Sequence, residues 1–256
     1  MATLIEAVPT SRRLKQGRHR IPSLLDLMMM DIAYWDDDFW GDQMRYDATA
    51  PGTYQSTASG AGAVAAAIST GVVNGAILLD AGTADDGRSD LSLGLHYRGD
   101  LNAIIWWRAQ VSAITSVKFE LGFTDVVSGT DAGGVNVKAT PSFTATDGVF
   151  LVYDRDDDAN LTLVGGQNGA AATAIDFSTV LAAATNYRFG IELRDTRARG
   201  FLLNADDQLI EETVWMESAV TAATLLTPWA FLQNRSATQR TMTIDHLRAY
   251  QRRTTA

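Results

Sequence analysis

The sequence of 256 residues contains no cysteine, only three histidines and no long uninterrupted apolar run. The absence of cysteine excludes disulfides, thiolate metal sites and a cysteine nucleophile. His19, His96 and His246 are far apart in the sequence, so no pair has the spacing of zinc ligands. The apolar residues 24–30 are interrupted by Asp26 and fall well short of the roughly 20 residues that span a bilayer. We therefore expect no membrane span. The first residues, which include Glu6, do not resemble a secretory signal.

Sequence signatures of common catalytic and cofactor sites are also missing. There is no G-x-S-x-G nucleophile elbow, and no glycine pattern of a phosphate-binding or dinucleotide-binding loop. Asp154, Asp156 and Asp158 have the spacing of a calcium loop, but Ala159 and Gly165 replace the glycine and glutamate that an EF-hand requires. We favour the interpretation that these three aspartates form an exposed acidic turn, and we keep them as a weak candidate for a calcium site. No cofactor is expected.

Paired carboxylates, as used by glycosidases, are not found at a useful spacing. Both acids must project from one strand face, which requires even spacing such as E-x-D-x-E. Glu192 and Asp195 are three residues apart, Glu120 and Asp125 are five apart, and Glu211 and Glu212 are adjacent. The sequence therefore predicts a protein that is not an enzyme.

What the chain does contain is a succession of segments that alternate apolar and polar residues. Val117, Phe119, Leu121 and Phe123 alternate with polar or small residues, and residues 187–194 repeat the pattern. Successive side chains of a strand point to opposite faces, so each strand is expected to have one buried and one wet face. Antiparallel sheets tolerate this arrangement. We predict an all-β antiparallel sandwich, with a hairpin at residues 200–214.

Basic charge is concentrated near the start of a protein whose net charge is −9. This net charge argues against nucleic-acid binding by the sandwich. The cluster is followed by Ser23, which can cap a short helix over residues 24–31. We predict two parts: an N-terminal arm with a short helix (residues 1–32) and a sandwich (residues 33–256). Candidate contacts of the arm with other subunits or a capsid are Arg12, Arg13, Lys15, Arg18, Arg20, Leu24, Leu27 and Met28, although a solvated tail and a core helix are the alternatives.

Large aromatic residues suggest an interface or a glycan contact. Trp106 and Trp107 are neighbours in one predicted strand, so one of them should face outward. Trp35 and Trp40 belong to an aspartate-rich segment that fits an edge strand or an entry segment capping the sandwich. Exposed tryptophan commonly contacts a sugar ring or a protein partner, but a covered sheet face is an equal alternative.

The order of several segments resembles a known group of proteins. FELGFTD is followed by GVFLVYDRDDDANLTLVG, NYRFGIELRDTRARGFLLNADDQLIEET and TMTIDHLRAYQ. This order is similar to that of laminin-G-like (concanavalin A-like) jelly-roll proteins among the structural proteins of tailed bacteriophages. The resemblance covers residues 35–251, with Ala205, Asp206 and Asp207 where a D-G turn is usual.

The resemblance implies a jelly-roll sandwich and a virion structural protein made in a host cytoplasm. Its partners would be a major capsid protein or tail proteins, with a capsid decoration protein or head fibre favoured over a tail or baseplate component. It also implies self-association, with a homotrimer favoured over a dimer. A carbohydrate-binding module for host glycans shares the fold and is the competing hypothesis.

Overall fold

The computed structural model of this protein describes residues 32–39, 54–69, 75–126 and 133–253. Within these ranges the chain forms two large antiparallel sheets, one small hairpin sheet and a single 3-10 turn, η2 (Gly99–Leu101). No helix in the described part is long and apolar enough to cross a membrane. The predicted helix at residues 24–31 and the basic arm before it lie outside the described residues.

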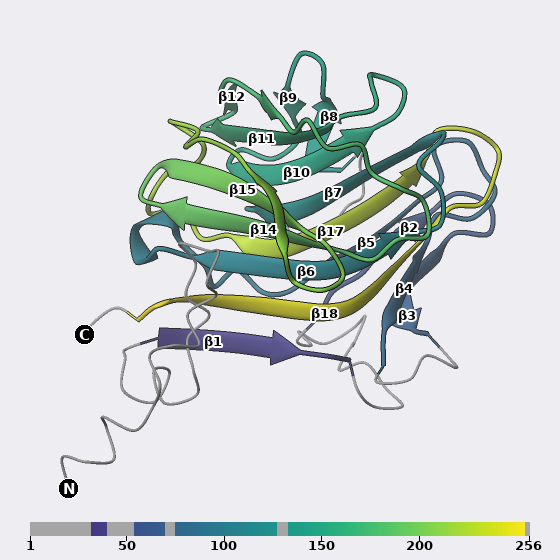
Figure 1. Cartoon of the computed structure of the whole chain (residues 1–256), viewed down its shortest axis with the longest axis horizontal. Helices are drawn as coiled ribbons and strands as arrows, with labels where there is room; N and C mark the ends of the chain where they lie inside the picture. Colours follow the sequence, from purple (N-terminus) through teal and green to yellow (C-terminus); the bar gives the residue numbers. More distant parts are fainter. Residues whose placement is uncertain (1–31, 40–53, 70–74, 127–132, 254–256) are drawn as a thin grey trace, which may run out of the picture.

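The first sheet has the strand order β16-β15-β14-β6-β18-β4-β3. The last strand, β18, pairs with β6 on one side, and with β4 and then β1 along the other. Figure 1 shows β1, β18, β6, β14 and β15 as neighbouring ribbons of one layer. The strands are β1 (Ile32–Asp37), β3 (Val64–Ile68), β4 (Ile77–Asp80), β6 (Ile104–Val111), β14 (Tyr187–Arg194), β15 (Arg197–Leu203), β16 (Leu209–Glu212) and β18 (Thr241–Arg252).

The second sheet has the order β12-β11-β10-β7-β17-β5-β2, and β13 pairs with β11. A separate hairpin of β8 (Val135–Val137) and β9 (Ser142–Phe143) lies in the connection between β7 and β10. The other strands are β2 (Ala58–Ser59), β5 (Arg88–Ser92), β7 (Val117–Thr124), β10 (Gly148–Asp154), β11 (Leu161–Gln167), β12 (Ala170–Ala171), β13 (Ile175–Asp176) and β17 (Thr227–Asn234).

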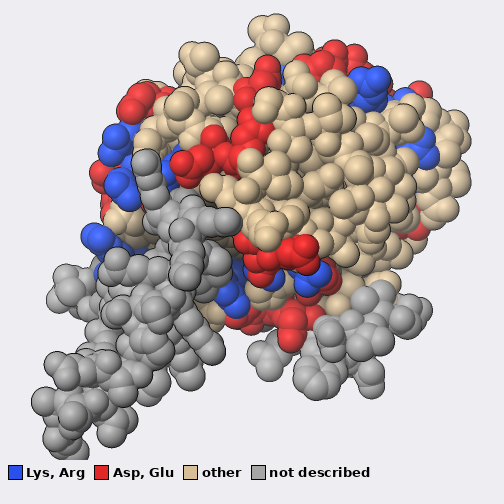
Figure 2. Space-filling model, viewed as in Figure 1, with Lys and Arg blue, Asp and Glu red and all other residues tan. Residues whose placement is uncertain are grey.

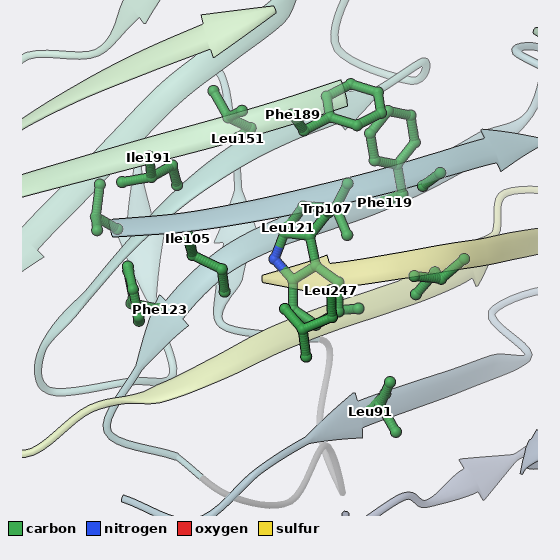
Figure 3. Packing of buried hydrophobic residues seen from close by; sticks show 14 of the residues in the cluster. Leu91, Ile105, Trp107, Phe119, Leu121, Phe123, Leu151, Phe189, Ile191 and Leu247 are labelled. Atoms are coloured by element: carbon green, nitrogen blue, oxygen red, sulfur yellow. The ribbon is translucent and has the colours of Figure 1, made fainter. Parts of the chain in front are cut away.

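The core lies between the two sheets and is built from the alternation seen in the sequence. Phe119, Leu121 and Phe123 of β7 face the core from the second sheet, and Phe189 and Ile191 of β14 face it from the first (Figure 3). All five are at most 2% exposed. The predicted antiparallel sandwich is confirmed, as is the hairpin at residues 200–214, which is β15 paired with β16.

The aspartate-rich segment forms the edge strand that the sequence indicated. Strand β1 pairs in register with the second half of β18. Trp35 faces inward, packs against the core, and donates its indole N–H to the Tyr54 hydroxyl at 3.1 Å. That hydroxyl in turn donates to Asp37 at 2.6 Å. Trp35 is therefore part of the packing of β1 on the sandwich rather than a free aromatic contact, while Trp40 lies outside the described residues.

The prediction that Trp106 or Trp107 is exposed is wrong. Trp107 faces the core and is 1% exposed. Trp106 lies on the outer face of the first sheet but is only 7% exposed, because its ring rests on Gly190 and against Phe201. A Cβ at Gly190 would come within 2.4 Å of the indole ring, so glycine makes this close approach to the backbone possible.

Candidate functional site

The outer face of the second sheet carries the one Lys–Glu ion pair of the described residues in which both side chains are fully buried. Lys118 and Glu120 of β7 point away from the sandwich core, and both are 0% exposed. Trp229 and Phe231 of the neighbouring strand β17 flank them and are equally buried. Buried ionisable groups often mark functional sites, so this face is a candidate site.

Glu120 binds four donors. Its carboxylate lies 3.0 Å from Lys118 Nζ and accepts hydrogen bonds from the backbone N–H of Gly134 (2.7 Å) and Val135 (3.0 Å). The fourth donor is the indole N–H of Trp229, at 3.1 Å. An ionised carboxylate has about four lone-pair positions. All of them are used within the protein, so this carboxylate has no position left to bind a substrate.

Lys118 is held by the same surroundings. Its ammonium group donates to the carbonyl oxygen of Val135 and lies 5.6 Å from the centre of the Phe231 ring. A charge that is removed from water is tolerated only when paired and hydrogen-bonded. The ion pair, the carbonyl and the ring together provide that compensation.

The element that buries this face is residues 133–146, which we call the cover segment. It contains the β8–β9 hairpin, and Val135, Ala145 and Phe143 pack with Phe150, Trp229 and Phe231 of the sheet. Glycine is required where it meets the sheet. A Cβ at Gly133 would lie 2.6 Å from Glu120 Oε1, and one at Gly134 would lie 2.3 Å from the Phe150 ring.

The turn of the cover segment is bound at a second point. The backbone N–H groups of Lys138 and Ala139 donate to Asp157, each at 3.0 Å. Lys138 Nζ donates to the carbonyl of Asn160 at 3.0 Å and forms an ion pair with Asp158. Burial alone would raise the pKa of Asp158, but the contact with Lys138 outweighs it and lowers that pKa.

The same region contains Asp154, Asp156 and Asp158, the weak candidate for a calcium site. Asp154 forms two contacts with the Arg235 guanidinium, and Asp158 binds Lys138. Asp156 lies 3.9 Å from Arg235. The carboxylates are thus paired with side-chain cations, and no group of three metal-ligating side chains occurs in the described part of the chain.

The sequence pattern missed this site. Alternation assigned Lys118 and Glu120 to a wet face of β7, whereas every side chain of β7 is buried. The reason is that the covering residues come from another part of the chain, 14 to 17 positions later for the cover segment and 109 for Trp229. The adjacent glycines Gly133 and Gly134 were the available signal, since such pairs often mark close backbone approach.

The predicted arm contacts, Arg12 to Met28, lie outside the described residues. The described chain begins at Ile32, which pairs with Arg252 near the other end of the sequence. Both ends of the described chain therefore lie at the same end of the first sheet, as Figure 1 shows.

Comparison with solved structures identifies the fold class. A protein of unknown function from Shewanella oneidensis MR-1 is similar at a TM-score of 0.59 and 12% identity, covering 94% of this chain and all of the other. Peanut lectin matches at 0.55 and 7% identity, over 86% of this chain and 97% of the lectin. A GH16 protein of Bacteroides ovatus, in complex with a mixed-linkage glucan product, matches at 0.52 and 7% identity, over 84% and 99%. No family model and no curated protein matches the sequence.

At these identities the likeness concerns the fold alone. The chain has the concanavalin A-like jelly-roll sandwich fold, as the sequence predicted. The fold is shared by lectins and by glycoside hydrolases, so the role of this chain must be argued from its own residues.

Proposed function

We propose that this protein is a non-enzymatic structural protein of a bacteriophage particle, of the capsid decoration or head-fibre type. Its particle partner would be the major capsid protein, contacted through the N-terminal arm (residues 1–32). The observation that carries the non-enzymatic part is the state of Glu120. This acid, central on a sheet face, is fully buried and bound to four donors, so it stabilises the cover segment and does not meet a substrate.

The virion part of the proposal rests on the order of sequence segments described above. The position of the chain ends supports it. Because Ile32 pairs with Arg252, residues 1–31 join the sandwich at the end of the first sheet where β18 also ends. The apolar and basic residues of the arm would then provide the attachment, and a tail or baseplate position is the alternative within the same class.

Attachment is tested with full-length variants rather than truncations. One variant changes Arg12, Arg13, Lys15, Arg18 and Arg20 to glutamate, and a second changes Leu24, Leu27 and Met28 to serine. We expect each variant to reduce incorporation into particles purified by density gradient, while circular dichroism of the body is unchanged. Normal occupancy by both variants would exclude the arm as the attachment. Loss of wild-type binding at high salt would identify a charge-driven contact.

Assembly is tested by mass in solution. We propose a homotrimer in preference to a dimer, on the resemblance alone. Light scattering of the full chain distinguishes the two, and a mass near 27.7 kDa would show a monomer before attachment.

Glycan recognition is the second candidate function, because lectins share this fold. Binding of the full-length protein to a glycan array, together with absence from particles, would favour it. Enzymatic activity is examined on the same glycans: release of reducing sugar by the purified full-length protein would refute the non-enzymatic assignment.

A further inference from the structure

A cluster of three arginines around one tryptophan occupies the outer face of the first sheet, at the end of the β14–β15 hairpin. Arg194 pairs with Arg197 across the hairpin, and Arg199 is two residues further on the same face. Their guanidinium groups lie 5.1, 5.4 and 4.7 Å from the centre of the Trp215 ring. In Figure 2, blue and red side chains lie next to one another along the left edge and again at the upper right, on either side of a broad uncharged area.

Trp215 is fixed in this position by the backbone. After β16 the chain continues alongside β15, where Met216 and Ala198 exchange two backbone hydrogen bonds of 2.7 and 3.0 Å. This pairing brings the indole ring beside the arginine side chains. Cation–π contacts of this kind favour flat guanidinium groups against a ring and restrict their rotamers.

The three arginines differ in how completely they are neutralised. Arg199 is 11% exposed and makes two short contacts with Glu192, at 2.7 and 2.8 Å. Arg194 is 50% exposed and shares the same Glu192 at 3.1 Å. Arg197 is 39% exposed, and its one carboxylate within 4.0 Å among the described residues is Glu217, at 3.9 Å. Glu217 is itself 71% exposed, so it holds Arg197 only loosely.

We propose that Arg194 and Arg197, supported by Trp215, form a binding site for an oxyanion, with a carboxylate-bearing sugar as the ligand class. The planar fork of a guanidinium matches the two oxygens of a carboxylate or phosphate. Because both guanidinium groups already lie against the Trp215 ring, less side-chain entropy would be lost when they bind.

Glu217 is the internal competitor of this site. It occupies the neighbourhood of Arg197 at a distance too long for a hydrogen bond, so a ligand carboxylate that approaches to 2.8 Å would replace it. A long polyanion such as nucleic acid is disfavoured by the net charge of −9, whereas a single anionic group is not. The proposal stands independently of a virion role.

The test uses the full-length protein and ligand-observed saturation-transfer NMR with glucuronate, with glucose as the neutral comparison. Line broadening of inorganic phosphate in ³¹P spectra distinguishes a general oxyanion site from one that requires a sugar. We expect glucuronate to bind at roughly millimolar affinity, about tenfold weaker in Arg197→Ala and in Arg194→Ala, and glucose not to bind. Binding of phosphate at equal strength would support the oxyanion site and show that the sugar adds little.

Two variants make the result specific. Glu217→Gln keeps the size of the side chain and removes its charge, so glucuronate should bind about threefold more tightly. Arg155→Ala removes an exposed arginine from the β10–β11 connection in the other sheet and should leave binding unchanged. No binding of either anion, or binding that Arg197→Ala does not weaken, would overturn the proposal, as would equal loss in Arg155→Ala.

Discussion

The outer faces of the two sheets bury their charged residues to different degrees: the most deeply buried ion pair of the first sheet, Arg199–Glu192, keeps 11% and 8% of its side chains exposed. On the second sheet, Lys118 and Glu120 are both 0% exposed beneath the cover segment. On the first sheet, ion pairs such as Arg108–Asp245 and Arg248–Asp36 keep 20 to 33% of their side chains exposed. A buried pair costs much desolvation and must be fully compensated, whereas an exposed pair is screened by water. The same residue types should therefore contribute very differently to stability on the two faces.

The largest expected effect comes from Glu120→Ala. This change leaves the Lys118 ammonium, two backbone N–H groups and the Trp229 indole N–H buried without their acceptor. Removing one partner of a buried pair typically costs about 3–5 kcal/mol, and the free energy of unfolding in urea should fall by that amount. The matched control is Glu217→Ala on the other face, which should change it by less than about 0.5 kcal/mol. Equal effects of the two variants would remove the distinction between the faces.

The two faces also differ in how well the sequence predicted them. The residues predicted to face inward were predicted correctly: Phe119, Leu121 and Phe123 form part of the core, as their spacing indicated. The residues of β7 predicted to face solvent are instead buried, because the burial of Lys118 depends on a segment that folds back from another part of the chain. Period-two alternation reports which residues share a face, and it contains no information about what lies on that face.

The same limit applies to the first sheet and to the arginine cluster. Trp106 was expected to be a candidate exposed anchor, but the absence of a side chain at Gly190, its partner in β14, lets the ring lie flat. Arg197 and Arg199 have the spacing of one strand face, which the sequence shows. Their meeting with Trp215 depends on the register of the segment after β16, which no local pattern specifies.

A packing change tests the first sheet at intermediate strength. In Gly190→Ala the new Cβ would meet the Trp106 ring at 2.4 Å, so the ring must move or the strands must shift. Overpacking of this kind costs about 1–3 kcal/mol. Urea unfolding measures the loss, and a change in tryptophan fluorescence would report displacement of the ring. In the double variant Gly190→Ala with Trp106→Ala, the loss of unfolding free energy should be smaller than the sum of the two single losses, because the new Cβ no longer meets an indole ring. Additive effects would contradict this contact.

The smallest effect is expected at Asp36, on the exposed side of β1 and β18. Its carboxylate accepts a hydrogen bond from the Tyr34 hydroxyl and contacts the side chains of His246 and Arg248. Burial would raise the pKa of Asp36, but the hydrogen bonds from these groups outweigh it, so its pKa is lowered in the folded protein. A lowered folded-state pKa contributes stability that is present above the unfolded value of about 3.9 and is lost as the pH falls through the folded value.

Asp36→Asn should therefore lower the free energy of unfolding by about 1 kcal/mol at pH 7, the upper range for exposed ion pairs. The difference from the unchanged protein should begin to shrink below about pH 4, where the carboxylate of the unfolded chain becomes protonated, and should vanish once the pH passes the lowered pKa of the folded protein. Urea titrations of both proteins at pH 7 and pH 3 measure this, and Asp195→Asn at an exposed turn serves as the control. A loss comparable to that of Glu120→Ala, or one that persists undiminished at pH 3, would show that the β1–β18 edge depends on Asp36 as strongly as β7 depends on Glu120.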